Sequence, residues 1–77
     1  MTVEVPAEIV RLLGILAARP EGSTQYELTK MRGVKSSLIY EAVMLGLARV
    51  ERERGSKDVV YRFFILPAGA QLLAVQE

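Results

Sequence analysis

The residue pattern changes its period once, near residue 47, and this change limits the folds open to the chain. Before it, apolar residues recur at helical spacing, whereas residues 48–54 alternate and are polar on one face. A turn cluster of Gly, Ser, Lys and Asp follows at 55–58, and residues 59–66 are rich in β-branched and aromatic types. Two such runs around a Gly-led turn predict a β-hairpin over residues 48–66.

Helices are predicted at both ends of the chain. Residues 6–18 begin with a proline, which suits a first helical turn, and end before Arg19-Pro20. This segment is apolar nearly all round, so it needs burial on two sides. Either a second subunit covers one side or the domain wraps its own central helix, and the sequence leaves both open. Residues 68–76, after Pro67, predict the last helix.

The middle of the chain predicts two short helices joined by a tight turn. After a turn or short extended segment at 21–23, Thr24 and Glu27 match the capping box at the start of a helix over 25–31. Gly33 can take the positive φ that ends this helix. Ser36 or Ser37 is expected to cap the next helix, over 35–45, and Gly46 to close it. The stripe expected to face the core contains Leu38, Ile39, Ala42, Val43 and Leu45.

These elements predict an α+β fold that is mainly α with a small β-hairpin. The order is helix, short strand, helix, helix, hairpin, helix, in one domain over residues 1–77. Two short helices around a Gly turn form a helix-turn-helix pattern, and the hairpin that follows makes it a winged helix-turn-helix.

Composition excludes several kinds of chemistry. The chain has no Cys and no His, which excludes disulfides, thiolate or imidazole metal sites and histidine acid–base catalysis. No phosphate loop or nucleophile–base pair is recognisable, so we expect neither an enzyme nor a bound cofactor or metal. No apolar run is long enough to cross a bilayer. The first residues include an acid, Glu4, where a signal peptide would carry basic charge. We therefore expect a cytoplasmic protein without a membrane partner.

Charge is unevenly distributed along the chain. Residues 30–62 carry eight basic and four acidic side chains, whereas the rest of the chain carries two basic and five acidic ones. A basic middle favours a surface that meets a polyanion. A solvated face with scattered charges would give the same pattern, and charge alone does not decide between the two.

Three stretches resemble the PadR and MarR families of bacterial and archaeal repressors. Leu-Leu-Gly-Ile-Leu at 12–16, followed by Gln-Tyr-Glu-Leu at 25–28, resembles the PadR opening. Residues 37–43 resemble the PadR recognition helix, and residues 65–73 resemble the segment that enters the last helix. Gln25 and Ala70 depart from the pattern, which has Gly and Arg at these places. The resemblance covers nearly the whole chain and implies a DNA-binding transcriptional regulator.

The residues allow this expectation to be made specific. We expect a homodimer, formed through helix 6–18 with helix 68–76, that binds double-stranded DNA. Helix 35–45 would enter the major groove by its first half, and hairpin 48–66 would act as the wing. The expected DNA contacts are Arg32, Lys35, Ser36, Ser37 and Tyr40, together with Arg52, Arg54 and Lys57 of the wing.

Each of these residues also has a structural interpretation. The two serines can serve only as helix caps, and Tyr40 can be an amphipathic residue at the edge of the core. The acids interleaved in the hairpin can pair with its arginines, above all with Arg49 and Arg62 at its base. Weak net charge also leaves open a winged-helix module that binds another protein in a larger assembly.

Overall fold

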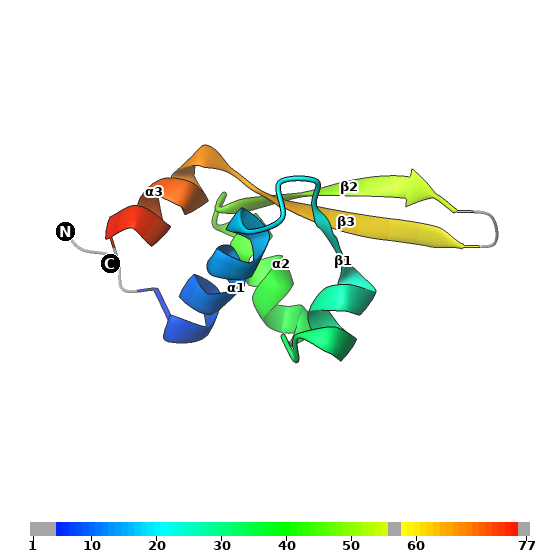
Figure 1. Ribbon diagram of the computed structural model, residues 1–77, viewed down its shortest axis with the longest axis horizontal. Helices are drawn as coiled ribbons and strands as arrows, with labels where there is room; N and C mark the ends of the chain where they lie inside the picture. The colour runs from blue at the N-terminus through cyan, green and yellow to red at the C-terminus, as the bar shows by residue number, and fades with distance from the viewer. Residues whose placement is uncertain (1–4, 56–57, 76–77) are drawn as a thin grey trace.

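The computed structural model describes residues 5–55 and 58–75 of the chain (Figure 1). The described part is a small α+β structure in the predicted order, and each element lies within two residues of its predicted bounds. The elements are α1 (Ala7–Ala17), β1 (Ser23–Thr24), η1 (Glu27–Met31), α2 (Ser36–Met44), β2 (Ala48–Arg54), β3 (Val59–Ile65) and α3 (Pro67–Val75). No helix among the described residues combines the length and hydrophobicity that a membrane crossing requires.

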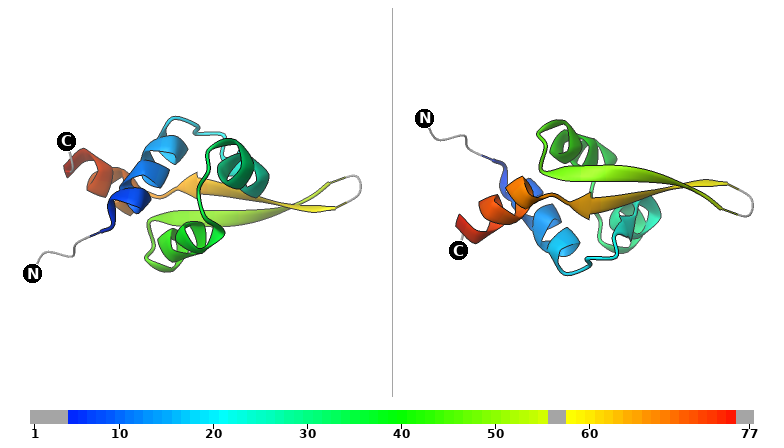
Figure 2. Two further views of the ribbon diagram at one scale, coloured as in Figure 1. Left: turned by 90° about the horizontal axis from the view of Figure 1, so that it is seen from below. Right: turned by 90° about the horizontal axis from the view of Figure 1, so that it is seen from above.

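The sheet is antiparallel, with strand order β1-β3-β2. β2 and β3 pair from Ala48 with Ile65 to Arg54 with Val59, and the Gly55 amide donates to the Asp58 carbonyl at 2.8 Å to close the hairpin. β1 pairs with β3 only at residues 62 and 63, so the outer part of the hairpin projects beyond the helices (Figure 2). The molecule is therefore elongated, with extents of 45 × 22 × 21 Å.

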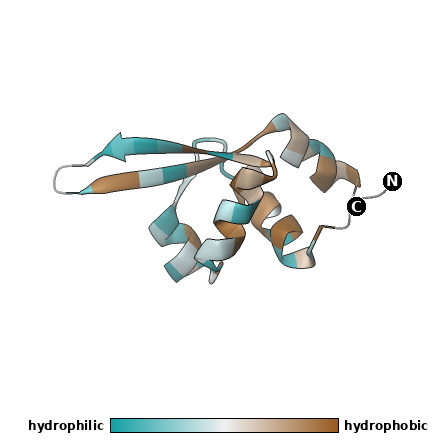
Figure 3. Ribbon diagram, turned by 180° about the vertical axis from the view of Figure 1, so that it is seen from behind, coloured by the Kyte–Doolittle hydropathy of each residue, from teal (hydrophilic) through white to brown (hydrophobic). Residues whose placement is uncertain are grey.

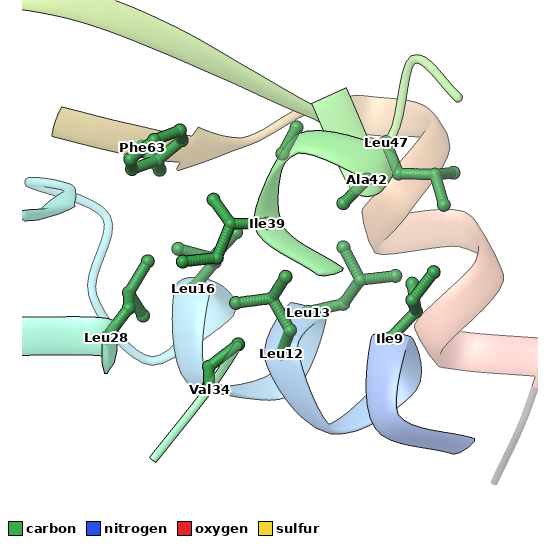
Figure 4. Packing of buried hydrophobic residues seen from close by; sticks show 11 residues of the cluster. Ile9, Leu12, Leu13, Leu16, Leu28, Val34, Ile39, Ala42, Leu47 and Phe63 are labelled. Carbon is green, nitrogen blue, oxygen red and sulfur yellow. The ribbon is translucent and has the colours of Figure 1, made fainter. Parts of the chain in front are cut away.

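The core is built around α1. Ile9, Leu12, Leu13 and Leu16 recur at helical spacing and are 0–1% exposed. They pack with residues of η1, α2 and β3 and with Leu47 (Figure 4). α1 also contacts α3, so one chain covers much of its wide apolar surface, as expected if the domain wraps its own central helix.

Two glycines end helices as predicted. Gly33 and Gly46 have φ values of 69° and 76°, a region that costs glycine little. After α2, the Gly46 amide donates to the Val43 carbonyl at 3.1 Å and the Leu47 amide donates to the Ala42 carbonyl at 3.0 Å. These two bonds form a Schellman motif, which satisfies carbonyls that the helix end would leave unpaired.

The expected serine cap of α2 is wrong. Lys35 occupies the N-cap position in an extended conformation, and neither serine caps the helix with its side chain. Ser36 is already the first helical residue, where a hydroxyl is badly placed for the amides of the next turn. The backbone N–H groups in the first turn of α2 therefore have no side-chain cap.

Two further expectations about the middle helices need correction. Leu45 does not face the core but is 51% exposed, because it follows α2 at the C-cap and turns toward the end of the molecule. The helix over 25–31 also widens into a π-helical turn, in which the Arg32 amide donates to the Glu27 carbonyl five residues earlier at 3.1 Å. No sequence pattern indicated this wider turn.

Candidate nucleic-acid interface

The β2–β3 register sorts the hairpin side chains onto two faces. Arg52 lies opposite Tyr61 and Arg54 opposite Val59, on the face that carries Phe63. Because Phe63 is buried against the helices, we call this the inner face. The outer face carries the other pairs, namely Arg49 with Phe64, Glu51 with Arg62, and Glu53 with Val60.

Arginines on the outer face are neutralised within the sheet. Arg49 forms an ion pair with Glu51, and its guanidinium lies 4.2 Å from the centre of the Phe64 ring. Arg62 donates to Glu53 at 2.7 Å and reaches the Gly22 carbonyl at 3.4 Å. For both arginines the structure shows the pairing within the sheet that the sequence left open.

Arginines on the inner face have a different environment. Within residues 5–55 and 58–75, no carboxylate lies within salt-bridge distance of Arg52 or Arg54. Their cross-strand neighbours are Tyr61 and Val59, which carry no charge to offset them. Both arginines are exposed, and Figure 3 shows β2 as hydrophilic along most of its length, beside a β3 that is hydrophobic at its start. Lys57, the third expected wing contact, lies outside the described residues.

The start of α2 exposes the residues expected to read DNA. Lys35, Ser36 and Ser37 are all exposed in the first turn. Tyr40 is 43% exposed, with its ring edge against Phe63 at 6.0 Å between centroids and an interplanar angle of 80°. One part of the ring therefore packs at the edge of the core, as the structural interpretation expects, and the rest meets solvent. Glu41, the next residue, is exposed as well.

Arg32 is not brought together with the wing. It lies at the end of η1 and lines a cleft of about 440 Å³ with Arg11, Gly14, Ile15, Ala18 and Arg19 of α1 and its C-terminal end. Its carbonyl accepts a hydrogen bond of 3.0 Å from the Arg11 guanidinium. The structure thus groups Arg32 with α1, away from the inner face of the hairpin.

A second cleft, of about 300 Å³, lies between the segment that leads into η1 and the wing. Its lining residues are Thr24, Gln25, Tyr26, Val59, Val60 and Tyr61. Tyr26 and Tyr61 are 68% and 41% exposed, so the cleft presents aromatic surface beside Arg52, which lies opposite Tyr61. Sequence reasoning did not single out Gln25 and Tyr26 as site residues, although their place directly after the cap Thr24 puts them in an exposed first turn.

The capping box fixes the position of that turn. Thr24 donates to Glu27 Oε1 through its amide at 3.2 Å and its hydroxyl at 3.0 Å, and the Glu27 amide donates back to Thr24 Oγ1 at 3.2 Å. These bonds from Thr24, followed by the charges of Arg19 and Arg62, hold the pKa of Glu27 below its ordinary value of 4.5. The predicted capping box is confirmed.

The site therefore combines an uncapped helix start, exposed tyrosines and, on one side of the hairpin, two arginines with no acidic partner among the described residues. No metal-binding group of three or more carboxylates occurs among the described residues. No family model, no curated protein and no solved structure matches this chain.

Proposed function

We propose that the protein is a small homodimeric transcriptional regulator that binds double-stranded DNA in a sequence-specific manner. In this proposal the α+β structure is a winged helix, with α2 as the recognition helix in the major groove and the β2–β3 hairpin as the wing. α2 has nine residues, and an α-helix with its side chains is about 10–12 Å across, which suits a groove about 12 Å wide.

The observation that carries the proposal is the sorting of arginines on the hairpin. A hairpin whose charges served only solubility would have no reason to pair one set and leave the other unpaired. Arg49 and Arg62 are paired on the outer face, whereas on the inner face Arg52 and Arg54 have no acidic partner in the described part of the chain. Phosphate groups would supply the missing negative charge, and the N–H groups at the start of α2 favour a phosphate as well.

The test compares two arginines of the same strand on opposite faces. Arg52→Ala and Arg49→Ala each remove one positive charge from β2. Binding of each variant to a random-sequence duplex is measured by fluorescence anisotropy across a range of salt concentrations. Arg52→Ala should flatten the slope of log K against log salt by roughly 0.9, the value for one lost phosphate contact. Arg49→Ala should leave the slope nearly unchanged. Equal slopes for the two variants and the wild-type protein would mean that Arg52 of the wing does not contact DNA phosphates.

Support for the homodimer lies at the end of the molecule opposite the hairpin. An apolar cleft of about 470 Å³ is lined by Val5, Leu45, Leu47, Ala68, Gln71, Leu72 and Val75. Its lining among residues 5–55 and 58–75 carries no charge, and Leu45 and Val75 are 51% and 76% exposed. An open apolar surface of this kind favours association. It lies mainly on α3 and the end of α2, so we assign α3 a larger share of the dimer contact than the sequence indicated. Two copies joined there could present their α2 helices to successive major grooves, about 34 Å apart.

The dimer is tested by placing a charge in this surface. Val75→Glu should convert the protein to monomer in sedimentation velocity, because a carboxylate would be buried without a partner. Ala74→Glu adds the same charge at the neighbouring exposed residue, which does not line the cleft, and should remain dimeric. A wild-type protein that stays monomeric at tens of micromolar would contradict the dimer.

The same apolar cleft also favours a second function, a winged-helix module that binds another protein in a larger assembly. Salt dependence separates the two functions, since phosphate contacts make DNA binding fall steeply with salt. Absent or salt-insensitive binding to duplex DNA would favour the protein-binding module.

A further inference from the structure

Gln25 connects the two helices that precede the hairpin, and its side chain bonds to the hydroxyls of Ser36 and Tyr40, two of the three that α2 presents outward. We infer that Gln25 fixes their hydrogen-bonding roles, so that Tyr40 faces DNA as an acceptor and Ser36 as a donor. The inference rests on the proposed function and specifies which bases that site selects.

Gln25 is held from both sides along the chain. It follows Thr24, whose reciprocal bonds with Glu27 fix the start of the helix. Its own carbonyl accepts a hydrogen bond of 2.8 Å from Thr29 Oγ1, one turn later. The residue is half-buried, and both contacts of its carboxamide with α2 lie at the exposed surface.

The carboxamide uses both its ends in contacts with α2. Gln25 Nε2 donates to Ser36 Oγ at 3.5 Å, and Tyr40 Oη donates to Gln25 Oε1 at 3.5 Å. The Tyr40 ring rests edge-on against Phe63, which limits where its hydroxyl can go. One side chain outside α2 therefore sets the orientation of two hydroxyls, one turn apart, on the exposed side of α2.

This arrangement determines what Tyr40 can recognise. A phenol has one hydrogen to donate, and here that hydrogen is directed to Gln25, so only oxygen lone pairs remain for DNA. Phosphate oxygens, guanine O6 and thymine O4 are acceptors and cannot bond to a lone pair. In the major groove the donors are cytosine N4 and adenine N6. Tyr40 therefore selects a base with an exocyclic amino group at its position.

Ser36 is left with the opposite role. Its oxygen accepts from Gln25, and its own hydrogen is free to donate. A phosphate oxygen or a purine N7 is the matching acceptor. Gln25 thus gives the two hydroxyls different partners, and it acts as a positioning residue for base selection.

The experiment begins with selection from a randomised duplex library by the wild-type protein and by Tyr40→Phe. The position whose preference disappears in Tyr40→Phe should carry adenine or cytosine in the wild-type site. Replacing that base by purine or 2-pyrimidinone, which lack the amino group, should weaken wild-type binding roughly two- to tenfold. The same replacement should leave the affinity of Tyr40→Phe unchanged.

Gln25 is tested with Gln25→Ala and Gln25→Met, the second of which keeps the length of the side chain. Either variant, with a normal melting temperature, should lose the preference for adenine or cytosine at that position while keeping its affinity for random duplex. Glu21→Ala is the control, because it truncates an exposed polar side chain that lies outside the candidate site, and it should keep the preference.

Two results would overturn the inference. One is a Tyr40-dependent preference for guanine or thymine in the wild-type protein. The other is an unchanged preference in both folded Gln25 variants. A wild-type protein that binds no duplex at low salt would give a different result, because it would overturn the proposed function and the inference with it.

Discussion

The helical body and the projecting hairpin are built on opposite principles. The largest fully buried side chains come from α1, η1, α2 and the inner part of β3, and they include Leu12, Leu28, Ile39 and Phe63. In β2, by contrast, only Ala48 is buried, and the strand is otherwise exposed. The body is therefore stabilised by apolar burial, whereas the projecting part of the hairpin depends on cross-strand bonds and paired charges. Most side chains in the projecting part of the hairpin contribute little to the core, which leaves them free to form an interface.

The largest expected difference between the two regions comes from truncating apolar residues. Ile39 is 1% exposed in the centre of the core, so Ile39→Ala should lower the free energy of unfolding by about 2–5 kcal/mol. Val59 is 38% exposed on the hairpin, and Val59→Ala should cost about 0.5 kcal/mol or less. Urea unfolding followed by circular dichroism measures both. Similar losses for the two variants would mean that the hairpin is part of the core.

The next largest effect concerns the packing of α3 on the body. A Cβ added to Gly69 would lie 2.3 Å from the Leu47 carbonyl oxygen, a backbone atom that cannot move aside easily. Gly69→Ala should therefore destabilise the protein by roughly 1–3 kcal/mol. Gly14→Ala is the control, since a Cβ there meets nothing within 4 Å and the residue lies inside α1. That change should stabilise the helix by about 0.5–1 kcal/mol. A neutral Gly69→Ala in thermal unfolding would show that α3 is not held this closely.

The features that the sequence predicted well are determined locally. The capping box involves residues three apart, and the glycines that end η1 and α2 act within one turn. The hairpin register follows from the closing turn at Gly55 and Asp58 and from the alternation of the two strands. In each case the interacting groups are close in sequence, so spacing alone was informative.

The features that the sequence did not predict depend on how distant elements meet. Gln25 reaches α2 across 11 and 15 residues, and Arg62 reaches the Gly22 carbonyl across 40. Gly22 itself has a φ of 92° and lies so close to β3 that a Cβ would meet the side chains of Phe64 and Arg62. Leu45 was misplaced because helical periodicity says which residues share a face but not where the helix axis ends against its neighbours. For the candidate site, the sequence therefore named the exposed start of α2 and the wing arginines, but not the glutamine between them.

A smaller expected effect is a pH dependence of the free energy of unfolding that comes from Glu27 in the helical body. Because the folded-state pKa of Glu27 lies below its ordinary value of 4.5, its ionised form stabilises the fold above that pH. This contribution is lost as the pH falls below 4.5 and through the folded-state pKa. This contribution should be smaller than the roughly 1 kcal/mol that a whole helix cap contributes. Glu27→Gln keeps a capping side chain but does not titrate there, so between pH 6 and about pH 3 it should lose less stability than the wild-type protein. An equal loss in both, measured by urea unfolding at each pH, would mean that other carboxylates account for the acid sensitivity.

The smallest expected effect is the difference in stability between Arg49→Ala and Arg52→Ala in the hairpin. Its order is opposite to the order expected for DNA binding. Arg49 stacks on Phe64 and pairs with Glu51, so Arg49→Ala should lower the free energy of unfolding by about 0.5–1 kcal/mol. Arg52 has no acidic partner among residues 5–55 and 58–75, and Arg52→Ala should leave the melting temperature unchanged. For the proposed DNA binding we expect the opposite order, with a large effect of Arg52→Ala and little effect of Arg49→Ala. The two residues differ by three positions in one strand, so both effects are measured on the same element with the same substitution. If Arg52→Ala proved the more destabilising variant, its effect on binding could not be separated from its effect on the fold, and the division of the hairpin into a structural and a binding face would fail.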